Sequence, residues 1–112
     1  MVYHFASRLE ECMSKEQIFL NPKLTLSDLA IRVGTNRTYL SNYINKVQHL
    51  TFFDYVNSFR LTYAAELLLT TNYTLEVIAE KSGFNSLSTF RRCFLQTHGC
   101  SPSVYKKEHR TL

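Results

Sequence analysis

A short pattern of two apolar residues, an alanine and a glycine occurs twice in this chain, 49 positions apart. The two copies are Leu26, Leu29, Ala30 and Gly34, and Leu75, Ile78, Ala79 and Gly83. Beyond the glycine the offset grows to 50, and a further apolar pair follows in each copy: Leu40 and Ile44, then Phe90 and Phe94. Spacings of three or four residues place side chains on one face of a helix, so each copy predicts two consecutive helices. The alanine lets the helices cross closely, and the glycine permits a sharp turn between them.

Two such helices are the arrangement of a helix-turn-helix, in which the second helix enters the major groove of DNA. The same spacing is compatible with an all-helical bundle in which alanine and glycine serve packing alone. Because the pattern occurs twice at a suitable separation, the sequence favours two helix-turn-helix units over the plain bundle.

A long apolar stretch, residues 51–69, lies between the two copies. Its apolar residues recur at helical spacing and predict one buried face, with Asp54, Asn57 and Arg60 largely between them. A helix of roughly 19 residues is about 28 Å long. This length suits two recognition helices placed about 34 Å apart, one turn of B-DNA.

The remaining elements follow from periodicity, capping residues and helix breakers. Further helices are expected at 2–14, 26–33, 37–48, 75–82 and 87–97, with a last one that starts at Ser101-Pro102. The predicted N-caps are Thr25 with Asp28 in a capping box, Asn36, Thr74, and Asn85 or Ser86. The residues expected to face inward are Phe5, Leu9, Cys12, Met13, Leu40, Tyr43, Ile44, Val47, Leu87, Phe90, Phe94, Val104 and Tyr105.

Composition is consistent with a small intracellular protein. The chain has 112 residues, 45% of them hydrophobic, which is enough for one compact domain or two very small subdomains. It has no signal-peptide pattern and no apolar run of about 18 residues, so we expect a cytoplasmic location, on the nucleoid, and no membrane contact. The three cysteines fit reduced thiols. The net charge is +4, and a basic surface suits a polyanion such as DNA.

The second half of the chain carries a specific family resemblance. Its segment Gly83–Lys106, GFNSLSTFRRCFLQTHGCSPSVYK, resembles the signature of the AraC/XylS family of bacterial transcription regulators. Leu24–Lys46 looks like the first helix-turn-helix of the same family, and the resemblance covers roughly residues 3 to 108. It implies an all-α DNA-binding domain of seven helices, with two helix-turn-helix subdomains joined by a long linker helix. The implied lobes are 1–50 and 71–112, with the linker at 51–70.

The first half departs from the family pattern at three places. Asn36-Arg37 stands where Ser-Pro is usual, Asn42 where Arg is common, and Ile44 where Phe is usual. The first unit is therefore expected to recognise a different DNA sequence, or to contribute less to recognition. Many members carry a sensing domain before this one, so the chain is either a stand-alone member or the C-terminal piece of a longer regulator.

The exposed side of each second helix supplies the candidate base contacts. By match to the family motif these are Thr38, Ser41 and Asn42 in the first unit, and Leu87, Ser88, Arg91 and Arg92 in the second. Asn can pair with adenine and Arg with guanine, while Leu87 either touches a thymine methyl or packs locally. Arg92 contacts either a base or a phosphate. Arg37 and Lys46 are the candidate phosphate contacts.

The basic residues near the C-terminus, Lys106, Lys107 and Arg110, contact DNA or form an ordinary solvated face. Cys93, His98 and Cys100 lack the spacing of a structural zinc site, so no metal is expected. No local motif organises a catalytic group, so neither an enzyme nor a cofactor is expected.

The predicted function is sequence-specific binding of double-stranded DNA. The chain is expected to belong to a bacterial transcription regulator that acts as an activator. The domain alone is expected to be a monomer. The alternative is a helical protein-interaction module that docks on the transcription machinery and binds DNA weakly. The family resemblance makes RNA polymerase a candidate partner under both hypotheses.

Overall fold

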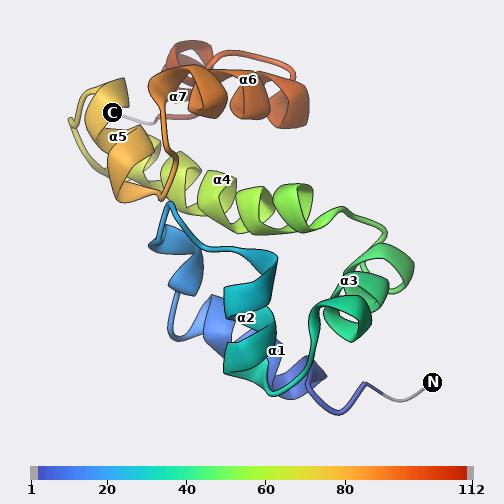
Figure 1. Cartoon of the computed structure of the whole chain (residues 1–112). Coiled ribbons are helices and arrows are strands. Elements are labelled where there is room, and N and C mark those ends of the chain that lie inside the picture. The colour runs from blue at the N-terminus through green and yellow to red at the C-terminus, as the bar shows by residue number, and fades with distance from the viewer. Residues whose placement is uncertain (1–2, 111–112) are drawn as a thin grey trace. The chain divides into compact units, whose positions relative to one another are not determined.

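The structure of the chain is a computed structural model that describes residues 3–110 (Figure 1). Within this range it contains seven α-helices, one short 3₁₀ helix and no strand. In chain order they are α1 (Ala6–Ser14), η1 (Ile18–Leu20), α2 (Leu26–Val33), α3 (Arg37–Lys46), α4 (Phe52–Thr70), α5 (Leu75–Lys81), α6 (Leu87–His98) and α7 (Pro102–His109). The predicted all-α fold, with two helix-turn-helix pairs and a long helix between them, is confirmed.

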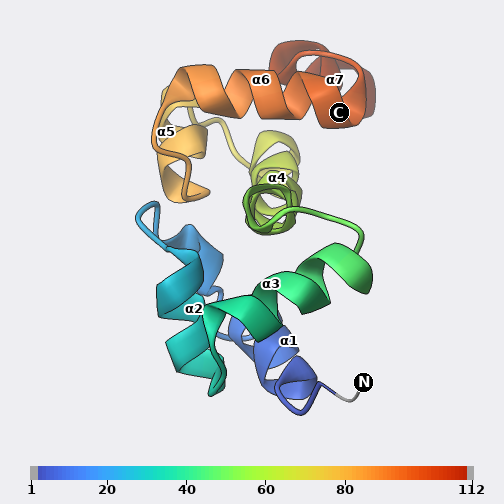
Figure 2. The same ribbon diagram turned by 45° about the vertical axis from the view of Figure 1, so that its right-hand side comes forward.

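The described chain forms two compact units, one that runs to Ser58 and one that begins at Phe59. In the first unit α1 packs against η1 and α2, and α2 packs against α3 (Figure 2). The buried residues of these elements, together with Phe5 just before α1, are Phe5, Leu9, Cys12, Met13, Phe19, Leu29, Ala30, Val33, Leu40 and Ile44. The ring of Tyr43 adds to them by meeting Phe5 edge to face, with 5.5 Å between ring centroids.

The second unit has its own hydrophobic core, built from the latter part of α4 together with α5 and α6. Its buried members are Leu61, Ala64, Ala65, Leu68, Ile78, Ala79, Phe84, Phe90, Cys93 and Phe94. Phe90 is enclosed by aromatic neighbours, with centroid distances of 5.2 Å to Phe84 and 5.7 Å to Phe94. Burial of several large rings against small alanines gives this short segment a well-packed core.

The two repeated glycines take the backbone conformation that the pattern predicts. Gly34 has φ 80° and Gly83 has φ 92°, both in the left-handed region that side chains with a Cβ rarely adopt. In each unit the chain turns there from the first helix of the pair toward the second. Ala30 and Ala79 are each 2% exposed, as expected for small residues where two helices cross closely.

Local capping sets where the helices begin. The Thr25 hydroxyl accepts a hydrogen bond from the Asp28 amide at 3.1 Å, and the Asp28 carboxylate accepts one from the Thr25 amide at 3.3 Å. The predicted capping box is therefore present. The side chains of Asn36, Thr74, Ser86 and Ser101 cap α3, α5, α6 and α7, each by accepting one hydrogen bond from the backbone amide three residues later, and Ser86 rather than Asn85 caps α6.

The expectation of a single buried face on α4 is wrong. Tyr55 and Val56 are buried, but so is Leu61, which lies about 140° around a helix of 3.6 residues per turn from Val56. Asn57 and Arg60, expected between the apolar positions, are 3% and 8% exposed. The cause is that α4 supplies buried residues to both units, so its enclosed surface is wider than one amphipathic stripe.

Several boundaries and orientations also differ from expectation. The first helix begins at Ala6 rather than at residue 2, which lies outside the described range. The helix expected at 37–48 ends at Lys46, because the chain leaves helical geometry and His49 has φ 59°. Val47, just past that end, is 48% exposed rather than inward-facing. Val104 is 42% exposed, since the inward line of α7 passes through Pro102 and Tyr105 instead.

Helix α7 is held to α6 by contacts between aromatic rings. Tyr105 lies 5.3 Å from Phe94 and 5.0 Å from His98, measured between ring centroids, and His109 stacks on Tyr105 at 4.2 Å. Burial lowers the pKa of His98, and the neighbouring His109 lowers it further. The side of α7 that carries Tyr105 is therefore the side that faces α6.

Replacement of Thr25 by Ala should lower the free energy of unfolding by about 1 kcal/mol, because one half of the capping box is lost. Chemical denaturation followed by circular dichroism measures the change. Thr97→Ala is the control, since it removes a hydroxyl from an exposed position on α6 that caps nothing, and it should stay within about 0.5 kcal/mol of the parent. Equal losses in the two variants would contradict the capping explanation.

Candidate nucleic-acid interface

Four of the five candidate residues in the first unit surround one surface hollow. Arg37, Thr38, Ser41 and Asn42 line it together with Leu26, and its volume is ≈ 440 Å³. The four come from the first two turns of α3 and are exposed or half-buried, whereas Leu40 and Ile44 of the same helix are fully buried. They present a guanidinium, two hydroxyls and an amide within one concave patch. Hydroxyl and amide groups of this kind can hydrogen-bond base edges, and the guanidinium suits a phosphate.

The polar groups of α3 are partly organised before any ligand is bound. The Asn45 amide donates a hydrogen bond of 3.4 Å to the Ser41 hydroxyl, which leaves the hydroxyl proton available to another acceptor. The side-chain oxygen of Asn36 accepts a hydrogen bond of 2.9 Å from the Tyr39 backbone amide, which fixes the start of the helix. Lys46 is exposed in the last turn and lies outside the hollow.

In the second unit the exposed face of α6 carries three of the four candidates. Ser88, Arg91 and Arg92 are all exposed, while Phe90 and Phe94 on the opposite side are fully buried. Within the described residues neither arginine forms an ion pair with a carboxylate. Two cationic groups that already lack an intramolecular partner keep their full donor capacity for phosphate or guanine.

Leu87 differs from the other candidates on α6. Its side chain is half-buried and packs against the core of the second unit. Of the two alternatives that the sequence left open for this residue, local packing is the one with a contact in the structure. A role in touching a thymine methyl remains a prediction that depends on the exposed remainder of the side chain.

Three residues of these surfaces were not among the candidates. Leu26 lines the hollow because the first residue of α2 lies beside the start of α3. Leu95 is 53% exposed, and it continues the face of Ser88, Arg91 and Arg92 by one turn. Asn45 is exposed and bonded to Ser41. Sequence spacing could have identified two of them, since Leu95 follows Ser88 by seven residues and Asn45 follows Ser41 by four. The position of Leu26 beside α3 could be found only from the way α2 and α3 cross.

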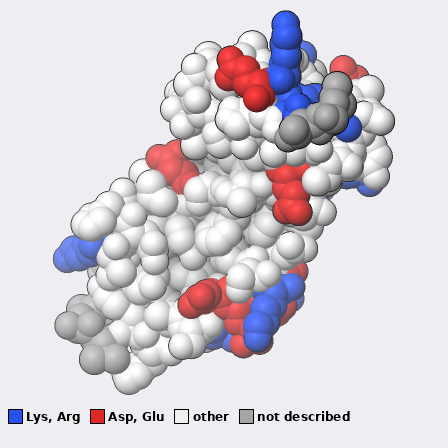
Figure 3. All heavy atoms as spheres, turned by 180° about the vertical axis from the view of Figure 1, so that it is seen from behind, with Lys and Arg blue, Asp and Glu red and all other residues white. Residues whose placement is uncertain are grey.

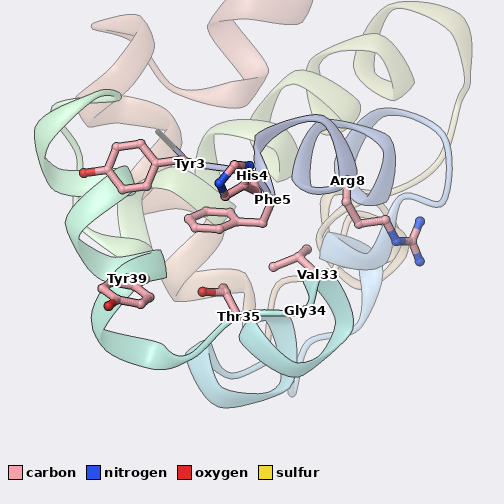
Figure 4. A pocket seen from close by; sticks show the side chains of 8 residues that line it. All are labelled: Tyr3, His4, Phe5, Arg8, Val33, Gly34, Thr35 and Tyr39. Carbon is pink, nitrogen blue, oxygen red and sulfur yellow. The ribbon is translucent and has the colours of Figure 1, made fainter. Parts of the chain in front are cut away.

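Another hollow of the first unit, of ≈ 420 Å³, has a mainly aromatic lining (Figure 4). Tyr3, Phe5 and Tyr39 lie on one side of it, and the Arg8 guanidinium points away from these rings. That guanidinium donates instead to Glu11 at 3.1 Å and to Glu16. The hollow therefore lacks a cation aimed into it and does not resemble a phosphate site.

The described part of the chain has no group of three or more His, Cys, Asp and Glu side chains arranged to hold a metal ion. Its helices are also too short or too polar for any of them to cross a bilayer. Cys12 and Cys93 are buried and Cys100 is half-buried, and none of the three forms a disulfide within the described residues. The polar hollow of α3 and the exposed basic face of α6 thus remain the chemically distinctive features of the two helix pairs.

Comparison with known proteins gives consistent matches. Residues 29–108 match the family described as Helix-turn-helix domain. The chain is 32% identical over 90 residues to the uncharacterized HTH-type transcriptional regulator YtdP of Bacillus subtilis, and 34% identical over 97 residues to the transcriptional activator NphR of Rhodococcus sp. These alignments cover 80% and 87% of this chain but 12% and 29% of those proteins. The chain therefore spans less than a third of the length of either relative.

Among solved structures, the chain is similar to the C-terminal domain of AraT, a response regulator from Geobacillus stearothermophilus. The TM-score is 0.86 at 26% sequence identity, with 98% of this chain and 89% of that domain covered. The match extends across nearly all the helices described above.

Replacement of Leu87 by Ala should destabilise the second unit by roughly 1–2 kcal/mol, about half the cost for a fully buried leucine, because the side chain is half-buried against the core. Chemical denaturation of the variant measures this. Ser88→Ala, one residue along and exposed, is the matched control and should change stability by less than about 0.5 kcal/mol. Unchanged stability of the Leu87 variant would show that the side chain contributes little to the core.

Proposed function

The chain belongs to the AraC/XylS family of helix-turn-helix transcription regulators, and on that premise we propose that it binds double-stranded DNA sequence-specifically within a bacterial regulator. Helices α3 and α6 are the recognition helices of the proposal. The observation that carries it is the exposed face of α6, where Ser88 and two arginines without carboxylate partners stand opposite a fully buried aromatic core. Such a face supplies donors to base edges without any rearrangement of the fold.

The proposal assigns a separate role to each part of the chain. Residues 1–50 and 71–112 form two DNA-reading lobes, and the linker helix 51–70 joins them. At about 1.5 Å per residue, the 19 residues of α4 give a helix about 28 Å long. This length suits two recognition helices that enter successive major grooves roughly 34 Å apart. Thr38, Ser41, Asn42, Ser88, Arg91 and Arg92 contact bases, and Arg37 and Lys46 contact phosphates. This domain alone acts as a monomer in the cytoplasm, without catalytic activity.

Activation of transcription is the direction of regulation that we propose. The support is the name of the similar protein NphR, a transcriptional activator. Activators of this family contact RNA polymerase while they are bound to DNA, so polymerase is the proposed protein partner.

Selection of bound duplexes from a random DNA library tests the proposed function. The purified chain at about 0.15 M salt, near physiological ionic strength, should recover two conserved blocks about 10 base pairs apart, because each lobe reads one major groove. A single conserved block would restrict sequence reading to one lobe. Binding that is purely non-specific and lost with rising salt would contradict sequence-specific recognition by this chain.

Arg92→Ala and Lys46→Ala should weaken DNA binding in different ways. The first should cost about 1–3 kcal/mol and relax the preference for one base, whereas the second should weaken all sequences alike and reduce the salt slope by about one unit. Titrations of the selected duplex and of single-base variants, at several salt concentrations, measure both effects. Lys15→Ala, which removes an exposed positive charge outside both recognition helices, is the charge-matched control. Unchanged affinity of the Arg92 variant would remove that residue from the interface.

A further inference from the structure

A basic groove lies on the second unit at residues that the DNA-reading surface does not use. It has a volume of ≈ 580 Å³ and is lined by Asn72, Ser103, Lys106, Lys107 and Arg110. Three of these side chains are cationic, the other two offer an amide and a hydroxyl, and none is acidic. No residue of α6 is among them. We refer to these five residues as the α7 groove.

The cations of the α7 groove have no carboxylate partner within the described residues. Two arginines of the first unit are paired instead: Arg8 and Arg32 both donate to Glu16, with the Arg32 bond at 3.3 Å. The bond from Arg8 is also the main cause of the lowered pKa of Glu16. Lys and Arg atoms lie on the part of the surface that the second unit forms, with Asp and Glu atoms beside them (Figure 3). This local excess of positive charge is available to an external anion.

The orientation of α7 turns the groove away from α6. Tyr105 contacts Phe94 and His98 of α6, so its side of α7 is the inner side. At 3.6 residues per turn, Ser103, Lys107 and Arg110 point about 140–160° away from Tyr105 around the helix. The groove and the contacts with α6 therefore lie on opposite sides of α7, and a helix with its side chains is about 10 Å across.

We propose that the α7 groove docks an acidic segment, rich in Asp and Glu, of a partner protein while α6 is engaged with DNA. Unpaired lysines and an arginine match carboxylates in charge, and the Asn72 amide and Ser103 hydroxyl can donate further hydrogen bonds. A DNA phosphate backbone fits the α7 groove less well than a carboxylate-rich segment does. A duplex bound to the exposed face of α6 would approach the second unit from a different side than the one on which the groove opens. The proposal goes beyond DNA reading, and its simultaneous-binding step rests on the proposed function.

A labelled oligoglutamate peptide is the probe, and fluorescence anisotropy at about 0.15 M salt is the measurement. The parent chain should bind the peptide both alone and when saturated with the selected duplex. The variant Lys107→Glu with Arg110→Glu should bind the peptide at least about tenfold more weakly, because like charges then face each other. Its DNA affinity and salt slope should match the parent.

Two further variants complete the design. Lys15→Glu with Lys23→Glu makes the same change of net charge at exposed positions of the first unit and should keep peptide binding. Lys107→Gln with Arg110→Gln removes the charges without placing anions at the C-terminal end of α7, where the helix dipole disfavours them, and should also weaken peptide binding. Circular dichroism melting curves establish that each variant is folded.

Four results would overturn the proposal: no binding of oligoglutamate by the parent, equal loss in the Lys15–Lys23 control, displacement of the peptide by duplex, or a lower DNA affinity with a reduced salt slope in the groove variants. The last two would identify the groove as a phosphate contact. Failure of the parent to bind any duplex would count against the proposed function and is seen separately in the DNA titration, since peptide binding by the free chain does not depend on it.

Discussion

The continuity of α4 is the constraint on which the rest of the structure depends. One helix of 19 residues supplies Tyr55 and Val56 to the burial of the first unit and four residues to the core of the second. Neither unit, at roughly half of 112 residues, has much apolar surface to spare, because small domains bury a smaller share of their surface than large ones. A shared helix lets each obtain part of its core from the same segment. The cost falls on the sequence of α4, which must place suitable residues on more than one face.

Within each unit the second helix is positioned by a short chain of local devices. A capped first helix, a small alanine at the crossing and a left-handed glycine set the direction in which the second helix leaves the turn. Paired buried residues, Leu40 with Ile44 and Phe90 with Phe94, then fix which side of that helix faces outward. The polar residues of α3 and α6 need no further support to be displayed. This is why recognition residues can vary between the units while the surrounding framework repeats.

The features that the sequence predicted well are those that neighbouring residues determine. Helix starts followed from capping side chains, and the repeated glycines and buried pairs followed from spacing alone. Two predictions that depended on distant segments were wrong: Val104 is exposed because the inward side of α7 is set by its packing on α6, and Arg60, expected between the apolar positions of α4, is only 8% exposed. The α3 candidates share a surface hollow, but the presence of Leu26 in it depends on how α2 crosses α3. The α7 groove was inaccessible to sequence reasoning for the same reason, since Asn72 is 34 positions before Lys106.

Net charge by itself says little about where an anion binds, and the placement of the cations here shows why. Arg8 and Arg32 are paired with Glu16, and Arg8 also with Glu11, so their charge is largely compensated within the first unit. The arginines of α6 and the cations of the α7 groove have no carboxylate partner in the described chain, yet they belong to surfaces that face different ways. In the proposed complex a DNA duplex engages the surface of α6, and the α7 groove keeps its unpaired charge. At physiological ionic strength salt largely screens the attraction between charges more than about 8 Å apart. Attraction between groups in contact with each other is screened less. The division of charge between the two surfaces, rather than its total, is the physical basis of the proposed binding of two different anionic partners at once.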